Sequence, residues 1–289
     1  MSHEAYCRRS SQRISPPVST ASASSMMARM LKVRVASHPE AGWNWDDYLA
    51  ISKALTQGVG VGKIYDSSVF PFGLVRMISW SYGGDFIDQE TGDAAFDTEA
   101  VQRAMGFLNT MVVEDQSAPL PGTEGVTNDR VGMNMWGPWA SWYIMADVEF
   151  GWGVAPIPMG TEEVVLAWGS TIAAFKSSEH QDEVRQFMDF FLSPDTQYQR
   201  AADWAWFPPG MAATEMEGFM EVDVLALTAD QKQFVIDSVA NGRAPFVHRE
   251  EARLQNIYDQ ELSLVFAGEQ TMEDALAAIQ EGWQEILEG

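Results

Sequence analysis

The chain has 289 residues and a formal net charge of −23, with 46% hydrophobic and 20% charged residues. It is long enough to bury a large core in one or two domains, and its sequence has no apolar run of about 18 residues that could cross a bilayer. Six basic and two acidic side chains give residues 1–40 a charge of +4, so residues 41–289 carry −27. A body this acidic argues against binding to a nucleic-acid backbone.

Neither a metal nor another cofactor is expected. The single cysteine, Cys7, excludes an intramolecular disulfide. The histidines lie far apart in the sequence and show no metal-ligand spacing; they are His3, His38, His180 and His248.

Residues 1–40 differ from the rest of the chain. They are rich in Ser, Arg and Met, and Pro16-Pro17 interrupts them. They contain basic residues but lack the continuous apolar stretch of a secretory signal peptide. We expect this segment to be disordered or of unrelated origin.

Two helices are predicted early in the globular part. Asn44 can cap a helix that carries Asp47 in its first turn. A second helix is predicted from Thr98, because apolar residues then recur at helical spacing: Val101, Ala104, Met105, Leu108, Met111 and Val112.

The segment Val131–Trp139 reads as a strand that runs directly into a helix. Val131–Trp136 is an apolar run of strand length, Gly137 permits a turn, and Pro138 suits the first helical position. Trp139 would then lie beside unpaired backbone N–H groups, a favourable setting for holding a sugar ring. The alternative is that Trp136, Trp139 and Trp142 are ordinary core aromatics.

The rest of the sequence predicts short strands followed by helices. Trp152–Pro156 and Val164–Phe175 are expected to form strands, and Ser178–Leu192 and Thr228–Ala240 helices. Two further helices should end at Gly268 and begin at Thr271, and Gly242 and Gly268 both suit helix C-terminal caps. The predicted class is α/β with a helical tail.

Several motifs, in this order, resemble the family 1 extracellular solute-binding proteins, the maltodextrin and glycerol-phosphate type of receptors that serve ABC importers. They are Trp43-Asn44-Trp45-Asp46-Asp47-Tyr48, Trp80-Ser81-Tyr82-Gly83-Gly84-Asp85, Met135-Trp136-Gly137-Pro138-Trp139, Gly153-Val154-Ala155-Pro156-Ile157-Pro158, Gly169-Ser170, Phe187-Met188-Asp189-Phe190-Phe191-Leu192-Ser193-Pro194 and the closing helix from Thr271 to Leu287.

The resemblance implies a type II periplasmic-binding-protein-like fold of two lobes joined by a hinge. Residues 41–160 would form the first part of the C-terminal lobe, and residues 161–203 would return to the N-terminal lobe. Residues 204–289 would form helices that pack on the C-terminal lobe. Because the family's Trp-Asp-Asp helix entry already arrives at Trp43, we expect an N-terminally truncated chain that lacks a front piece on the order of 100 residues.

The resemblance also implies a ligand-binding site between the lobes. Trp139 falls on the family's stacking aromatic, next to Trp136, and the loop with Phe72 and Gly73 falls where a pocket wall is built. The remaining predicted site residues are Trp168 and Gly169 at the crossover, Trp206 near the cleft rim, and Arg253 and Gln255 on a long helix. For Arg253, a solvated helix face paired with Glu250 or Glu251 is an equal alternative.

The resulting hypothesis is a monomeric sugar- or oligosaccharide-binding component of an ABC importer. Its partners would be the membrane permease subunits, and its location periplasmic or extracellular, although the chain shows no signal peptide. One alternative is a carbohydrate hydrolase using Asp46-Asp47 or Glu162-Glu163, although adjacent helical residues do not face one another. The other alternative is a remnant that folds as a lobe and binds no ligand.

Overall fold

A computed structural model describes residues 41–58, 65–68, 71–121, 131–135, 154–167, 172–204, 211–222 and 227–289. All of them belong to one compact unit, His38–Gly289. None of the helices in these ranges is both long enough and apolar enough to span a membrane.

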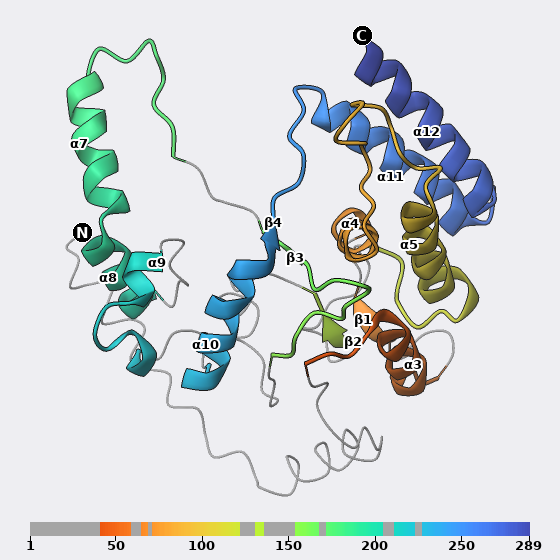
Figure 1. The fold of residues 1–289 in the computed structure, drawn as a ribbon, viewed down its shortest axis with the longest axis horizontal. Helices are drawn as coiled ribbons and strands as arrows, with labels where there is room; N and C mark the ends of the chain where they lie inside the picture. The colour runs from red at the N-terminus through yellow and green to blue at the C-terminus, as the bar shows by residue number, and fades with distance from the viewer. Residues whose placement is uncertain are drawn as a thin grey trace, which may run out of the picture. The chain divides into compact units, whose positions relative to one another are not determined.

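Helices outnumber strands in this unit (Figure 1). The first half contains α3 (Trp45–Leu55), β1 (Tyr65–Ser68), α4 (Pro71–Ser81), α5 (Glu99–Asn109), η1 (Thr110–Glu114), β2 (Val131–Asn134) and β3 (Val165–Leu166). The second half contains α7 (Gln181–Leu192), α8 (Pro194–Trp204), α9 (Met211–Thr214), η4 (Phe219–Glu221), α10 (Ala229–Ser238), η5 (Val239–Asn241), β4 (Gly242–Arg243), α11 (Glu251–Ala267) and α12 (Met272–Glu288).

The strands form two parallel pairs. β1 pairs with β2 in a register that sets Tyr65 opposite Val131. β3 pairs with β4, with Val165 opposite Gly242. Parallel strands require a crossover connection, and α4 and α5 lie between β1 and β2 in the chain. This arrangement confirms the predicted α/β class.

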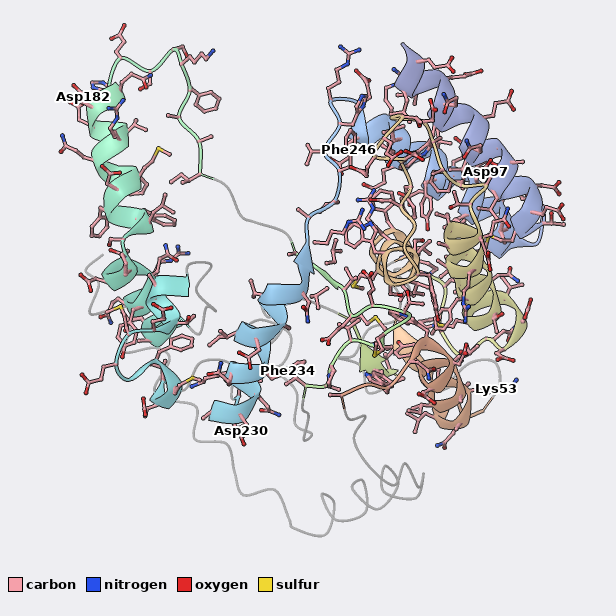
Figure 2. All side chains as sticks on the ribbon, viewed as in Figure 1. Lys53, Asp97, Asp182, Asp230, Phe234 and Phe246 are labelled. Carbon is pink, nitrogen blue, oxygen red and sulfur yellow. The ribbon has the colours of Figure 1, made fainter. Side chains whose placement is uncertain are left out.

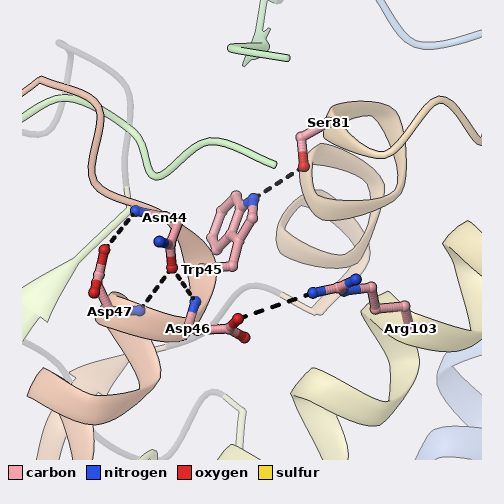
Figure 3. A network of polar contacts seen from close by, with 6 residues as sticks. All are labelled: Asn44, Trp45, Asp46, Asp47, Ser81 and Arg103. Atoms are coloured by element: carbon pink, nitrogen blue, oxygen red, sulfur yellow. Dashed lines mark hydrogen bonds and ion pairs between the residues drawn. The ribbon is translucent and has the colours of Figure 1, made fainter. Parts of the chain in front are cut away.

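The N-terminus of α3 is a complete capping box, as the sequence predicted (Figure 3). The side-chain oxygen of Asn44 accepts hydrogen bonds from the backbone N–H groups of Asp46 and Asp47, both at 2.9 Å. The Asn44 N–H donates to the Asp47 carboxylate at 3.0 Å. Next to the cap, the indole N–H of Trp45 donates to the Ser81 hydroxyl at 3.0 Å, which fastens α3 to the end of α4.

An aromatic cluster forms the centre of the main core. Its five rings are Phe72, Phe86, Phe96, Tyr258 and Trp283, all of them buried. Trp283 meets Phe96 edge to face at 4.8 Å, and its indole N–H donates to the Leu254 carbonyl at 2.9 Å. Edge-to-face contacts of this kind add stabilisation beyond burial. The cluster therefore joins α4 to α11 and α12, which lie far away in the sequence.

The predicted helix after Thr98 is confirmed with its apolar stripe. It begins at Glu99 and continues through the π-helical turn η1. All six predicted stripe residues are buried: Val101, Ala104, Met105, Leu108, Met111 and Val112.

The pair α11 and α12 is tied to the rest of the core by polar side chains as well as apolar ones. The amide oxygens of Gln284 and Gln280 accept hydrogen bonds from the backbone N–H groups of Ala94 and Phe96, at 2.9 and 2.7 Å. Gly282 lets the helices approach closely, because a Cβ at this position would lie 3.1 Å from the Ile257 side chain. Figure 1 shows α11 and α12 side by side, next to α4 and α5.

The segment from α7 to α10 has a smaller core. Phe219, Ala201 and Leu227 form its buried centre. Lys232 is 1% exposed, and its ammonium donates to the carbonyls of Met220, at 2.7 Å, and Val222 at the end of η4. By contrast, α7 has no buried residue. Its predicted apolar stripe is therefore not packed in a core within the described part of the chain.

Two strand predictions were wrong in the described residues. In the expected strand Trp152–Pro156, the described residues from 154 on form no strand, because Pro156 has no N–H to donate. In the expected strand Val164–Phe175, β3 covers Val165–Leu166 alone among the described residues, and residues 172–175 form no strand. Gly242 is the C-terminal cap of η5, which follows α10, as predicted, but with an extended backbone at φ −72°. Gly268, with φ 74°, does cap α11 as predicted.

Replacing Trp283 by Ala should destabilise the protein by about 3–5 kcal/mol, because it removes the largest ring of the aromatic cluster and leaves a cavity. Urea unfolding followed by circular dichroism measures this loss. Phe190→Ala is the control, since the Phe190 side chain is 62% exposed and should cost less than about 0.5 kcal/mol. Equal losses in the two variants would contradict the role given to the cluster.

Asn44→Ala should cost about 1 kcal/mol of stability, because it leaves the first N–H groups of α3 without their acceptor. Asn44→Asp keeps an acceptor oxygen and should retain most of the stability. The same urea titration compares the two variants. A loss in Asn44→Asp as large as that in Asn44→Ala would show that the cap is not what stabilises this end of α3.

Candidate functional site

Five of the nine predicted site residues lie outside the described residues: Trp136, Trp139, Trp168, Gly169 and Trp206. The structure does describe the strands that lead to four of them. β2 ends at Asn134, two residues before Trp136, and β3 ends at Leu166, two residues before Trp168. In open α/β sheets, ligands bind beyond the carboxyl ends of parallel strands. The predicted tryptophans therefore follow the strand ends where a ligand site is expected.

Phe72 and Gly73 lie in the first turn of α4, so the predicted loop at this point is wrong. Pro71 begins the helix, because its fixed φ suits the first helical position. Phe72 is 4% exposed and meets Tyr258 edge to face at 5.3 Å. Its ring therefore contributes to the aromatic core, and a role of Phe72 and Gly73 in ligand binding stays a prediction.

Arg253 and Gln255 lie in the first turns of α11. The Arg253 guanidinium is exposed and donates to the Glu250 carboxylate at 3.2 Å, which is the pairing that the alternative interpretation predicted. Gln255 is half-buried. Burial raises the pKa of Asp259, and a hydrogen bond with Gln255 partly offsets this increase. Residues two positions apart on a helix point in different directions, so a single ligand group would meet one of the two.

A buried arginine next to these residues was missed by the sequence analysis. Arg76 lies in α4 and is 3% exposed, with its guanidinium carbon 4.4 Å from the centre of the Phe72 ring. Burial lowers its pKa, while the nearby carboxylates of Asp85 and Glu251 oppose the decrease. Its Nε and Nη1 atoms have no hydrogen-bond partner within the described part of the chain. The sequence signal that could have identified Arg76 is that it is a single charged residue inside the apolar run from Phe72 to Trp80.

Arg243, in β4, contacts Asp85 and Trp80, and both of these residues lie close to Arg76. The Arg243 guanidinium donates to the Asp85 carboxylate at 2.8 Å and lies 4.8 Å from the centre of the Trp80 ring. The Arg243 carbonyl accepts a hydrogen bond from the N–H of Ala167, the residue before Trp168. The ion pair therefore holds the end of α4, β4 and the approach to Trp168 in one arrangement.

The described residues offer little that could support catalysis or a metal. No group of three His, Cys, Asp or Glu side chains among them could hold a metal ion. Asp47 is used in the α3 capping box, and Asp46 lies 4.0 Å from Arg103 (Figure 3). Glu162, in a bend, and Glu163, directly after it, are exposed. Neither acidic pair has the facing geometry of two catalytic carboxylates.

Solved structures with the same fold are bacterial substrate-binding proteins. An ABC substrate-binding protein from Listeria monocytogenes, in complex with cycloalternan, has a TM-score of 0.73 at 18% identity, covering 87% of this chain and 66% of that one. The sugar-binding protein MalE from Xanthomonas citri has a TM-score of 0.71 at 20% identity, covering 89% and 66%. UgpB from Mycobacterium tuberculosis, in complex with glycerophosphocholine, has a TM-score of 0.72 at 16% identity, covering 88% and 65%.

These similarities show that the chain has the α/β fold of type II periplasmic binding proteins, as predicted. The chain spans 65–66% of the length of these three relatives. Among proteins with curated descriptions, none matches its sequence.

Residues 25–198 match the sequence family described as bacterial extracellular solute-binding protein. The match covers well over half of the chain. It begins inside the segment 1–40, although an unrelated origin of that segment was one expectation. It also contains the predicted site residues Trp136, Trp139, Trp168 and Gly169. The chain belongs to the family of bacterial extracellular solute-binding proteins.

Proposed function

We propose that this protein is the substrate-binding component of an ABC importer and that it binds a sugar or an oligosaccharide. The family match over residues 25–198 is the observation that carries the proposal. Binding proteins of this kind make and break no covalent bond. We therefore propose a binding role and no enzymatic one.

The ligand site of this proposal lies beyond the ends of β2 and β3. Trp139, with Trp136 beside it, would supply the main stacking surface. Trp168 and Gly169 would face it from the segment after β3, and Trp206 would lie near the rim. An indole offers an apolar face to the C–H groups of a sugar ring and an N–H to its hydroxyls.

Relatives with this fold bind different ligands, so the fold alone does not determine the substrate. Solved structures include a MalE from Bdellovibrio bacteriovorus bound to maltotriose and a protein from Thermotoga lettingae bound to α-D-tagatose. UgpB, by contrast, binds glycerophosphocholine. We favour a sugar because four of the nine predicted site residues are tryptophans, whereas a phosphodiester calls for fixed cationic groups. Arg253, the cation among the predicted residues, is exposed and paired with Glu250.

The proposed mechanism is closure of two lobes on the sugar about a hinge. The lobe boundaries proposed from the resemblance, residues 41–160, 161–203 and 204–289, set β3 close to the first chain crossing and β4 within the part that packs on the C-terminal lobe. The Arg243–Asp85 ion pair would then hold β4 against the lobe that contains α4. We further propose that the loaded protein docks on the permease subunits of its importer, at a periplasmic or extracellular location, as a monomer.

The two alternatives make different predictions for the same preparation. A carbohydrate hydrolase would release reducing sugar from maltotriose, which the proposal does not allow. A remnant without binding function would show no heat of binding with any ligand tested. These two measurements on the unmodified protein therefore distinguish both alternatives from the proposal.

Trp139→Ala should weaken sugar binding about five- to tenfold, because stacking on one aromatic ring contributes about 1–1.5 kcal/mol beyond burial. Isothermal titration calorimetry with maltotriose measures the change. Trp139→Tyr keeps an aromatic face and should recover most of the affinity, and the urea midpoints of both variants report on the fold. Unchanged affinity in Trp139→Ala would remove Trp139 from the site.

The ligand class is tested by titrating maltotriose, tagatose, glycerophosphocholine and a free amino acid against the unmodified protein. We expect binding to one of the two carbohydrates and none to the amino acid. Binding to glycerophosphocholine or the amino acid without binding to either carbohydrate would overturn the substrate class, although the receptor role would stand.

A further inference from the structure

A groove of about 850 Å³ runs between α5 and α12, and none of the described residues proposed to bind sugar lines it. One wall is α12, from which every fourth residue faces the groove: Met272, Leu276, Gln280, Gln284 and Glu288. The row spans the full helix, about 24 Å at a rise of about 1.5 Å per residue. The other wall contains Gln102 and Gly106 of α5, and Asp97, labelled in Figure 2, lies just before that helix.

The floor of the groove is apolar. Phe96, which belongs to the aromatic cluster, lies beneath it, and Leu276 and Met272 are partly buried along its side. Ala277 adds a small exposed apolar side chain. A surface of this composition, long and bounded by two helices, fits the apolar face of a third helix better than it fits a compact solute.

The rim of the groove is acidic, and no basic side chain of the described residues neutralises its charge. Five carboxylates line it, with no lysine or arginine: Asp97, Glu273, Glu281, Glu285 and Glu288. Within the described part of the chain, no cation forms an ion pair with any of them. Glu285 and Glu288 also lie at the C-terminal end of α12, where the helix dipole disfavours negative charge and favours a cation.

Gly106 keeps the wall of the groove open. It lies inside α5, where glycine destabilises a helix relative to alanine. Its φ is not positive, and a Cβ at this position would meet no atom within 4 Å. Neither the backbone nor the packing of the described chain therefore requires glycine here, and any larger side chain would project into the groove.

We propose that this groove binds a basic, amphipathic helical segment of a partner polypeptide. Apolar side chains at positions i, i+4 and i+7 of that segment would lie on Leu276 and Phe96. Lysine or arginine side chains on its flanks would pair with the glutamates of the rim. A second copy of this chain is a poor occupant, because two molecules of net charge −23 repel each other.

The test uses fluorescence anisotropy with a labelled 16-residue helical peptide that has leucines at those positions and lysines on both flanks. A second peptide replaces the lysines by glutamate, and a third keeps the lysines but shuffles the leucines around the helix. The first peptide should bind with an affinity that falls as salt is added. The other two should bind at least tenfold more weakly.

Two variants alter the groove in different ways. Gly106→Leu fills it without changing the charge, and Glu281→Lys/Glu285→Lys reverses part of the rim. Each should weaken binding of the first peptide at least tenfold while leaving sugar affinity unchanged. The matched control is Glu215→Lys/Glu217→Lys, which makes the same change in net charge on exposed residues outside the groove and should alter peptide affinity less than threefold.

Three results would overturn the proposal. Unchanged peptide binding in Gly106→Leu, with an unchanged urea midpoint, would show that the groove is not the docking surface. An equal loss in the control variant, or equal binding of the shuffled peptide, would show attraction by net charge alone. Self-association of the protein that Gly106→Leu abolishes would assign the groove to a second copy. Because sugar affinity is measured separately, failure here leaves the receptor function untouched.

Discussion

The packing of Trp283 against Phe96 and Phe72 is the constraint on which the rest of the described structure depends. These rings bring the C-terminal helix α12 into contact with residues about two hundred positions earlier in the chain. The indole N–H of Trp283 and the phenol of Tyr258 are both satisfied inside the core, by the carbonyls of Leu254 and Pro71. Burial raises the pKa of Tyr258 far above its ordinary value, so it stays a neutral donor. The cluster fixes α4 and α11, and therefore the positions of Gly73 and Gln255.

The same packing supports described elements of both surfaces proposed for binding. Phe96 and Leu276 form the floor of the acidic groove on one side of the cluster. Phe72 of the cluster lies 4.4 Å from the Arg76 guanidinium and meets Tyr258 of α11, the helix that carries Arg253 and Gln255. The Asp85–Arg243 ion pair adds a polar connection from the end of α4 to β4. A single core can therefore support a sugar site at strand ends and a docking surface for a polypeptide.

Local chemistry made much of this fold predictable from the sequence. Asn44 and Asp47 carry the whole capping box, and the apolar stripe after Thr98 is buried as its periodicity indicates. Predictions failed where contacts with distant parts of the chain determine the local structure. β1 was not predicted, because its one aromatic and three polar residues form a strand only through pairing with β2. Pro71 begins a helix where a loop was expected, and Phe72 packs in the aromatic cluster, edge to face with Phe86. Arg76 was missed because its burial depends on rings supplied by other segments. The tryptophans of the proposed site stay predictions, because they lie outside the described residues.

The central claim is that tryptophans after the strand ends, and not those of the core, hold the sugar. The chain has 11 tryptophans, and each indole N–H gives its own signal in a nitrogen-15 NMR spectrum. Titration with maltotriose, with signals assigned by single Trp→Phe substitutions, should move those of Trp139 and Trp168. Those of Trp45 and Trp283, whose N–H groups donate to Ser81 and Leu254, should stay in place. Movement of the core signals without movement at Trp139 or Trp168 would contradict the account.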